Sequence, residues 1–141
     1  MQTEKVIDYI VNWLKDYATK AGVKGFVIGV SGGVDSGVVS TLCAMTGLKV
    51  LALEMPIRQQ KDQASRALEH IDFLKNKFPN VEGFTVDLNE PFEALYKTFD
   101  VKDDEFPAEK LAFANTRSRL RMLTLYYYGQ INGLLVCGTG N

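Results

Sequence analysis

A run of glycine, hydroxyl and acidic residues between positions 29 and 36 has the composition that points most directly to chemistry. Gly32 and Gly33 permit backbone angles that other residues avoid, so the run suits a tight turn. The N–H groups of such a turn point inward beside the N-terminus of a following helix, which favours an anion with several oxygens. We therefore predict a phosphate-binding turn made of Gly29, Val30, Ser31, Gly32, Gly33, Val34, Asp35 and Ser36.

Asp35 is the unusual member of this turn, because a carboxylate repels the phosphates that the rest of the turn attracts. A divalent cation between the two would remove the repulsion, and Mg²⁺ is commonly held by one or two carboxylates together with substrate phosphates. Asp35 therefore indicates a metal site. The alternative is that Asp35 and Ser36 only cap the following helix, as aspartate and serine often do.

Two common phosphate-binding motifs do not fit the turn. The P-loop requires a lysine, and no lysine lies between Gly25 and Gly47. The dinucleotide fingerprint requires a glycine two residues after Gly29, where this sequence has Ser31. The turn is therefore of a different class, and positive charge for a bound polyphosphate has to come from elsewhere in the chain.

The composition is that of a globular domain. The 141 residues suit one domain, and 46% of them are hydrophobic and 23% charged. A net charge of −1 gives no electrostatic reason to expect a nucleic-acid partner. No run approaches the ~18 apolar residues of a membrane helix, so we expect a cytoplasmic protein without a membrane partner. Cys43 and Cys137 form no C-x-x-C motif and are interpreted as small core residues.

Alternating helices and strands are expected to position the turn. The predicted elements are a helix over Thr3–Ala21, a strand over 27–30, a helix over 36–46, a strand over 50–55, a helix from 62, a strand over 81–87, a short helix over 89–99, a long helix over 108–131 and a strand over 134–137. This order predicts an α/β fold, a doubly wound parallel sheet with helices on both faces.

Several side chains within these elements have expected structural roles. Apolar spacing places Val6 and Leu14 on the buried face of the first helix. Asp62 and Asn89 are expected to cap the third and fourth helices. His70 falls off the apolar stripe of the third helix and is interpreted as a surface residue.

Polar side chains that follow strands are further candidates, since ligands of parallel sheets bind beyond the carboxyl ends of the strands. Arg58, Gln59 and Lys61 follow the second strand, and they either face a nucleotide or belong to a solvated loop. Thr139 stands in the turn that follows the last strand, Gly138–Asn141. We expect Thr139 to share a crevice with the phosphate-binding turn.

Three arginines alternate along the predicted long helix, at positions 117, 119 and 121. At about 100° per residue, Arg117 and Arg121 share one face of the helix and Arg119 points to nearly the opposite side. Such clusters are usually solvated. This helix is nevertheless a candidate source of the cation that the turn lacks.

The sequence SGGVDS after a hydrophobic strand resembles the signature of the N-type ATP pyrophosphatases, which cleave ATP between the α and β phosphates. Together with ANTRSRLRM on the long helix and LLVCGTGN after it, the chain more narrowly resembles the ammonia-dependent NAD synthetases. The resemblance implies an adenine nucleotide alpha hydrolase-like fold and a homodimer. It implies that Gly29–Ser36 and Thr139 bind ATP, that Asp35 binds Mg²⁺, and that Arg119, the first arginine of R-x-R-M, contacts deamido-NAD.

The implied reaction is the ATP-dependent amidation of deamido-NAD with ammonia to NAD, through a carboxyl adenylate, with release of AMP and pyrophosphate. Members of that family continue for nearly as long again, so residues 1–141 are expected to be one nucleotide-binding domain, the N-terminal part of a longer synthetase. No glutaminase domain is recognised, which favours free ammonia as the nitrogen source. Two different functions stay open: another ATP pyrophosphatase of the tRNA-modifying or amidotransferase type, and a non-catalytic nucleotide-binding module.

Overall fold

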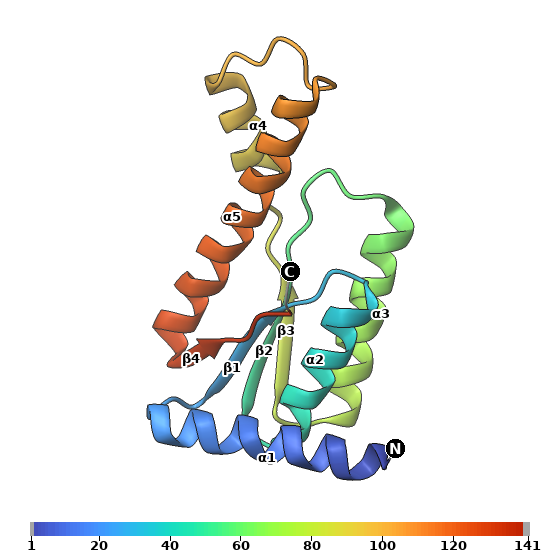
Figure 1. The fold of residues 1–141 in the computed structure, drawn as a ribbon, viewed down its shortest axis with the longest axis vertical. Helices are drawn as coiled ribbons and strands as arrows, with labels where there is room; N and C mark the ends of the chain where they lie inside the picture. The colour runs from blue at the N-terminus through green and yellow to red at the C-terminus, as the bar shows by residue number, and fades with distance from the viewer. Residues whose placement is uncertain (1, 140–141) are drawn as a thin grey trace.

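A computed structural model describes residues 2–139 and contains a four-stranded parallel sheet with helices on both faces (Figure 1). The elements in chain order are α1 (Thr3–Ala21), β1 (Gly25–Gly29), α2 (Val34–Met45), β2 (Lys49–Glu54), α3 (Lys61–Lys77), β3 (Val81–Thr85), α4 (Asn89–Thr98), α5 (Pro107–Asn132) and β4 (Leu134–Val136). The predicted fold class, a doubly wound parallel sheet, is confirmed.

The order of the strands places the turn that is predicted to bind phosphate at a reversal point of the sheet. The order is β3-β2-β1-β4, so β2 and β3 lie on one side of β1 and β4 lies on the other. Val27 of β1 pairs with both Leu51 of β2 and Val136 of β4. Ligands of open parallel sheets bind beyond the carboxyl ends of the strands at such a reversal. The turn that follows β1 starts there.

Two apolar layers hold the helices on the sheet, because successive strand residues point to opposite faces. Phe26 and Ile28 of β1 pack on the face that α1, α2 and α3 cover. Val27 of the same strand, with Leu53 of β2, packs on the other face, which α5 covers through Leu125. Figure 1 shows α2 and α3 on one side of the strands and α5 on the other. The crevice beyond β1 therefore has walls from both faces.

The buried face of α1 differs in part from its prediction. Leu14 is buried as predicted, and Ala18 one turn later is also buried. Val6, expected on the same face, is 43% exposed. The helix packs on the sheet core through Ile10, Leu14 and Ala18, roughly one residue per turn, and this row of contacts ends before Val6.

The two predicted side-chain caps are wrong. The N-cap of α3 is Gln60 and that of α4 is Leu88, and neither makes a side-chain capping bond. Asp62 lies inside the first turn of α3, where its negative charge suits the helix dipole. The side-chain oxygen of Asn89 accepts a hydrogen bond at 2.7 Å from the backbone N–H of Arg58, so a tertiary contact replaces the local cap.

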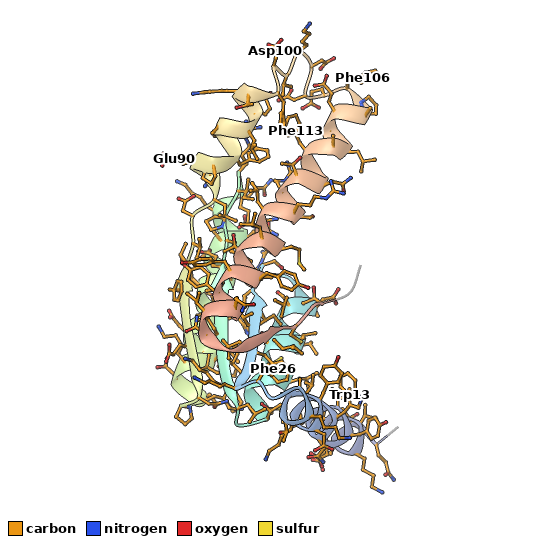
Figure 2. All side chains as sticks on the ribbon, turned by 90° about the vertical axis from the view of Figure 1, so that its left-hand side faces the viewer. Trp13, Phe26, Glu90, Asp100, Phe106 and Phe113 are labelled. Atoms are coloured by element: carbon orange, nitrogen blue, oxygen red, sulfur yellow. The ribbon has the colours of Figure 1, made fainter. Side chains whose placement is uncertain are left out.

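Helix α4 and the first half of α5 project beyond the carboxyl ends of the strands (Figures 1 and 2). Aromatic contacts join the two helices: the ring of Phe113 lies 5.8 Å from that of Phe92 and 5.0 Å from that of Tyr96. Figure 2 labels Phe113 where the two helices face each other.

Among the helices of residues 2–139, none combines the length and the apolar composition needed to cross a membrane.

Candidate nucleotide-binding site

The turn after β1 is shaped by hydrogen bonds between its own residues. The hydroxyl of Ser36 accepts a hydrogen bond at 3.1 Å from the N–H of Ser31 and donates one at 3.3 Å to the carbonyl of Gly33. The two serine hydroxyls lie 3.2 Å apart. The N–H of Gly33 donates to the Ser31 hydroxyl at 3.3 Å. These bonds bring two hydroxyl groups together at the end of β1.

Gly32 is required by both its backbone angle and its surroundings. Its φ of +86° lies in the region that favours glycine. A Cβ at this position would lie 2.5 Å from the carbonyl oxygen of Gln63 in α3. The turn therefore rests directly on the first turns of α3, and a side chain there would separate the two.

The N-terminus of α2 points toward the turn without a cap. Gly33 is the N-cap residue and makes no side-chain capping bond, so the first N–H groups of the helix are not satisfied by a side chain. Asp35 lies exposed in the first turn of α2. The interpretation of Asp35 as a capping residue is therefore wrong. Both the helix dipole and the free N–H groups favour an anion at this end.

A pocket of about 440 Å³ opens beside the turn. Its lining residues come from β1, α2, α5 and β4 and from the segments that follow β1, β2 and β4. They are Gly29, Val30, Ser31, Ser36, Met55, Gln59, Ser118, Arg121, Met122, Leu125, Val136, Cys137, Gly138 and Thr139. Five of the predicted ATP-binding residues are among them: Gly29, Val30, Ser31, Ser36 and Thr139. Gly32, Gly33, Val34 and Asp35 belong to the same turn but do not line the pocket.

Thr139 and the turn are brought together by the pairing of β4 with β1. The predicted neighbourhood of Thr139 and Ser31 is therefore observed. Gly140 and Asn141, the rest of the predicted last turn, lie outside the described residues. Cys137 is half-buried and lines the pocket, whereas Cys43 is buried in the core as predicted.

The long helix α5 contributes the second wall of the pocket. Arg121 is half-buried, and its Nε donates a hydrogen bond at 3.0 Å to the carbonyl of Met55, which follows β2. Arg119 is exposed and does not line the pocket. Arg117, one turn before Arg121, lies 5.9 Å from the ring of Phe92. The structure thus brings Arg121 to the turn and places Arg119 away from it.

Comparison with known proteins identifies the family of this chain. A family model described as NAD synthase matches residues 6–141. The chain belongs to the NAD synthase family. It is 38% identical over 142 aligned positions to the NH(3)-dependent NAD(+) synthetase of Mesoplasma florum, covering 100% of this chain and 55% of the relative. It is 36% identical to the enzyme of that name from Finegoldia magna, with the same coverage.

Solved structures of the family share the fold over the whole chain. An NMN synthetase from Francisella tularensis has a TM-score of 0.84 at 34% identity and covers 100% of this chain. An NH3-dependent NAD synthetase from Campylobacter jejuni, solved with a nitrate ion, has a TM-score of 0.84 at 28% identity. This chain covers 56% of the first and 58% of the second. It therefore spans about half the length of the relatives that it matches.

The loop after β2 is the third part of the site, and its residues divide between two roles. Gln59 lines the pocket. Arg58, with a φ of +50°, turns away and pairs with Glu93 of α4, with its Nε 2.6 Å from a carboxylate oxygen. Its guanidinium also lies 4.5 Å from the ring of Tyr96. Lys61 begins α3 and does not line the pocket. Arg58 thus anchors the loop that carries Gln59.

The Arg58 pair changes the ionisation of its partner. The guanidinium holds the pKa of the Glu93 carboxyl below its ordinary value, chiefly through their hydrogen bond.

Residues 2–139 contain no group of three or more His, Cys, Asp or Glu side chains that could hold a metal ion by themselves. A metal at this site would therefore need oxygens from a bound phosphate in addition to Asp35.

His70 has a role behind the turn that the sequence did not indicate. Its Nε2 lies 3.0 Å from the hydroxyl of Ser40, and this buried hydroxyl lies 2.6 Å from the carbonyl of Ser36, to which it donates. Burial lowers the pKa of His70, which favours the neutral form of the ring. The ring joins α3 to α2 just behind the pocket. Only the packing of two helices distant in sequence reveals this contact.

Proposed function

We propose that this chain binds ATP in the pocket and forms the nucleotide-binding part of an enzyme that amidates deamido-NAD with ammonia. The observation that carries the proposal is the meeting of the Ser31–Ser36 turn with Thr139 of the last turn in one pocket. Family membership supports the same reaction, as does the uncapped N-terminus of α2 beside the two serine hydroxyls.

In the proposed reaction, the carboxylate of deamido-NAD attacks the α phosphate of ATP and pyrophosphate leaves; ammonia then displaces AMP. The turn contributes backbone N–H groups and the hydroxyls of Ser31 and Ser36, which can donate to phosphate oxygens. The helix N-terminus stabilises the negative charge that grows on the departing pyrophosphate. No protein nucleophile is required, since positioning and charge stabilisation can supply the rate enhancement.

Asp35 fits the role of a Mg²⁺ ligand. Its carboxylate is exposed in the first turn of α2, next to Ser36 of the pocket, and Mg²⁺ typically takes one or two carboxylates with substrate phosphates. A bound Mg²⁺ would neutralise phosphate charge during the reaction. We expect Asp35→Ala to abolish AMP formation in the complete enzyme, and normal AMP release would contradict the assignment.

A second candidate substrate follows from the comparison with the NMN synthetase of Francisella tularensis, which is 34% identical to this chain. A chain of that type would amidate the corresponding nicotinate mononucleotide. Two more functions are compatible with a phosphate-binding turn of this class. One is an ATP pyrophosphatase that acts on RNA or a different acid, and the second is a nucleotide-binding module without turnover.

One experiment separates these functions. AMP release from ATP, Mg²⁺ and ammonium is measured with deamido-NAD, with nicotinate mononucleotide, with tRNA, and with no acceptor. We expect release that depends on deamido-NAD. Release that depends on the mononucleotide or on tRNA would replace the proposed substrate. If both this chain and a longer one bind ATP but release no AMP with any of the acceptors, the result would favour the nucleotide-binding module.

We also propose that two chains pair through α5. The outer side of this helix exposes a set of apolar residues that a partner would cover: Leu111, Leu123, Tyr126, Tyr127 and Ile131. Arg119 lies exposed on the same helix, so the assigned contact with deamido-NAD would be made near a subunit boundary. Light scattering should give the mass of a dimer, and Tyr126→Glu should give that of a monomer.

A further inference from the structure

Within residues 2–139, Arg121 is the only charged residue that lines the pocket. The remaining lining residues are apolar side chains, glycines, hydroxyl groups, an amide and a thiol. The turn itself contains no lysine or arginine. A nucleotide triphosphate carries several negative charges, so Arg121 is positioned to supply the cation that this turn lacks.

Among the described residues, Arg121 forms no ion pair with a carboxylate. Within residues 2–139 the ion pairs involve Arg58, Arg66 and Lys110, and not Arg121. Burial, together with the nearby charge of Arg117, lowers the pKa of Arg121. A half-buried cation without a counter-ion costs free energy, and an anionic ligand would recover it.

The orientation of Arg121 is set before any ligand binds. Its Nε donates to the carbonyl of Met55, which fixes the plane of the guanidinium at the end of β2. Leu125, one turn later, is buried in the sheet core and fixes the rotation of α5. The guanidinium has further N–H donors beyond the one on Nε. An arginine held in this way loses little side-chain entropy when it binds an anion.

We propose that Arg121 binds a phosphate group of the nucleotide from the α5 side of the pocket, while the Ser31–Ser36 turn binds phosphate from the other face of the sheet. The proposal rests on the proposed function, because it requires ATP in this pocket. The planar fork of arginine can donate two parallel hydrogen bonds to one phosphate, which a lysine cannot. Arg121 is thereby distinguished from Arg119, which is exposed and does not line the pocket.

The test is calorimetric titration of the protein with ATP, with inorganic tripolyphosphate and with adenosine. The variants are Arg121→Gln, which removes the charge, and Arg121→Lys, which keeps it without the fork. Lys110→Gln is the matched control, because it removes one positive charge from the same helix at an exposed position. Circular dichroism and thermal unfolding verify that each variant is folded.

We expect Arg121→Gln to weaken ATP and tripolyphosphate binding by about 10-fold to 100-fold, the usual range for a hydrogen bond to a charged group. Adenosine affinity should stay within about 2-fold of that of the unmodified protein, since no charge is involved. Arg121→Lys should retain more affinity than Arg121→Gln, and Lys110→Gln should bind all three ligands normally.

The outcomes separate this inference from the proposed function. If the unmodified protein binds neither ATP nor tripolyphosphate, the proposed function fails and this inference fails with it. If the unmodified protein binds ATP and Arg121→Gln binds it equally well, only the role of Arg121 is refuted. Equal losses for adenosine and ATP in both Arg121 variants would also refute it, because they would show a structural role.

Discussion

The two walls of the pocket are held in place by different kinds of interaction. In the turn after β1, the bonds that set its shape join residues two to five positions apart, such as the N–H of Ser31 and the hydroxyl of Ser36. In the wall made by α5, the bond that orients Arg121 reaches Met55, which is 66 positions away. The turn is a local structure, and the helix wall is a tertiary one.

This difference determines how each wall should respond to substitution. The turn depends on backbone angles and short hydrogen bonds, so changes there should act on its own geometry first. The helix wall depends on the apolar contacts that fix the rotation of α5, and Arg121 is only as well placed as those contacts allow. Four sets of variants test the distinction, from the largest expected effect on stability to the smallest.

Leu125→Ala should give the largest effect. Leu125 is 6% exposed and packs in the core between α5 and the sheet, so truncation should lower the free energy of unfolding by about 3 kcal/mol. Urea denaturation measures this loss. Leu68→Ala is the matched control, because Leu68 of α3 is 44% exposed and its loss should cost about 1 kcal/mol or less. Equal effects would mean that Leu125 does not hold the helix wall.

Gly32→Ala should destabilise the protein by about 2 kcal/mol, from the strained φ and the collision with the carbonyl of Gln63. Gly47→Ala provides the comparison, since Gly47 has a φ of +77° but open space around its Cβ position. It should cost about 1 kcal/mol, the strain alone. ATP affinity should fall for Gly32→Ala only. Identical results for the two would show that the turn does not depend on its contact with α3.

Ser36→Ala should cost about 1 kcal/mol, because the N–H of Ser31 loses its acceptor, the hydroxyl of the buried Ser36. ATP affinity should fall by about 10-fold, as a phosphate-facing hydroxyl is lost with it. Thr41→Ala removes a hydroxyl from the same helix that only bonds back to the carbonyl of Gly37, and it should leave ATP affinity unchanged. Titration calorimetry compares the two; a similar loss for both would contradict a specific role of Ser36.

The Arg58–Glu93 pair should give the smallest effect, because both side chains are substantially exposed and screened. The pKa of Glu93 is lowered in the folded state, so its contribution is present above the ordinary glutamate value of about 4.5 and is lost as pH falls below it. Glu93→Gln should therefore be less stable than the unmodified protein at pH 7, and the difference should shrink steadily as the pH falls below the ordinary glutamate value. A difference that persists at low pH would rule out the charge interaction as its cause.

The sequence predicted the fold class and the position of the turn after β1, for reasons that particular residues show. Alternating apolar segments predicted the order of helices and strands, and the bounds of α1 followed from the spacing that Gly22 ends. Gly32 could be expected at a positive φ because only the turn geometry accounts for two adjacent glycines there. The closeness of Thr139 to the turn followed from the rule that the carboxyl ends of parallel strands lie at the same edge of the sheet.

The sequence could not predict contacts that depend on how distant elements meet. The side-chain caps expected at Asp62 and Asn89 were wrong, since a tertiary bond to Arg58 takes the oxygen of Asn89. The Ser40–His70 contact was missed because neither residue indicates the other in the sequence. Helical spacing separated Arg119 from Arg121 but could not say which of them faces the pocket.

The sequence by itself determined the local structure beside the pocket: a glycine and serine turn at the end of a buried strand, within a doubly wound sheet. Short-range backbone preferences and apolar periodicity suffice for that, because both are written in neighbouring residues. Only the tertiary structure decided which arginine faces the turn. The burial of Leu125 sets the rotation of α5, and that rotation directs Arg121 inward and leaves Arg119 outside.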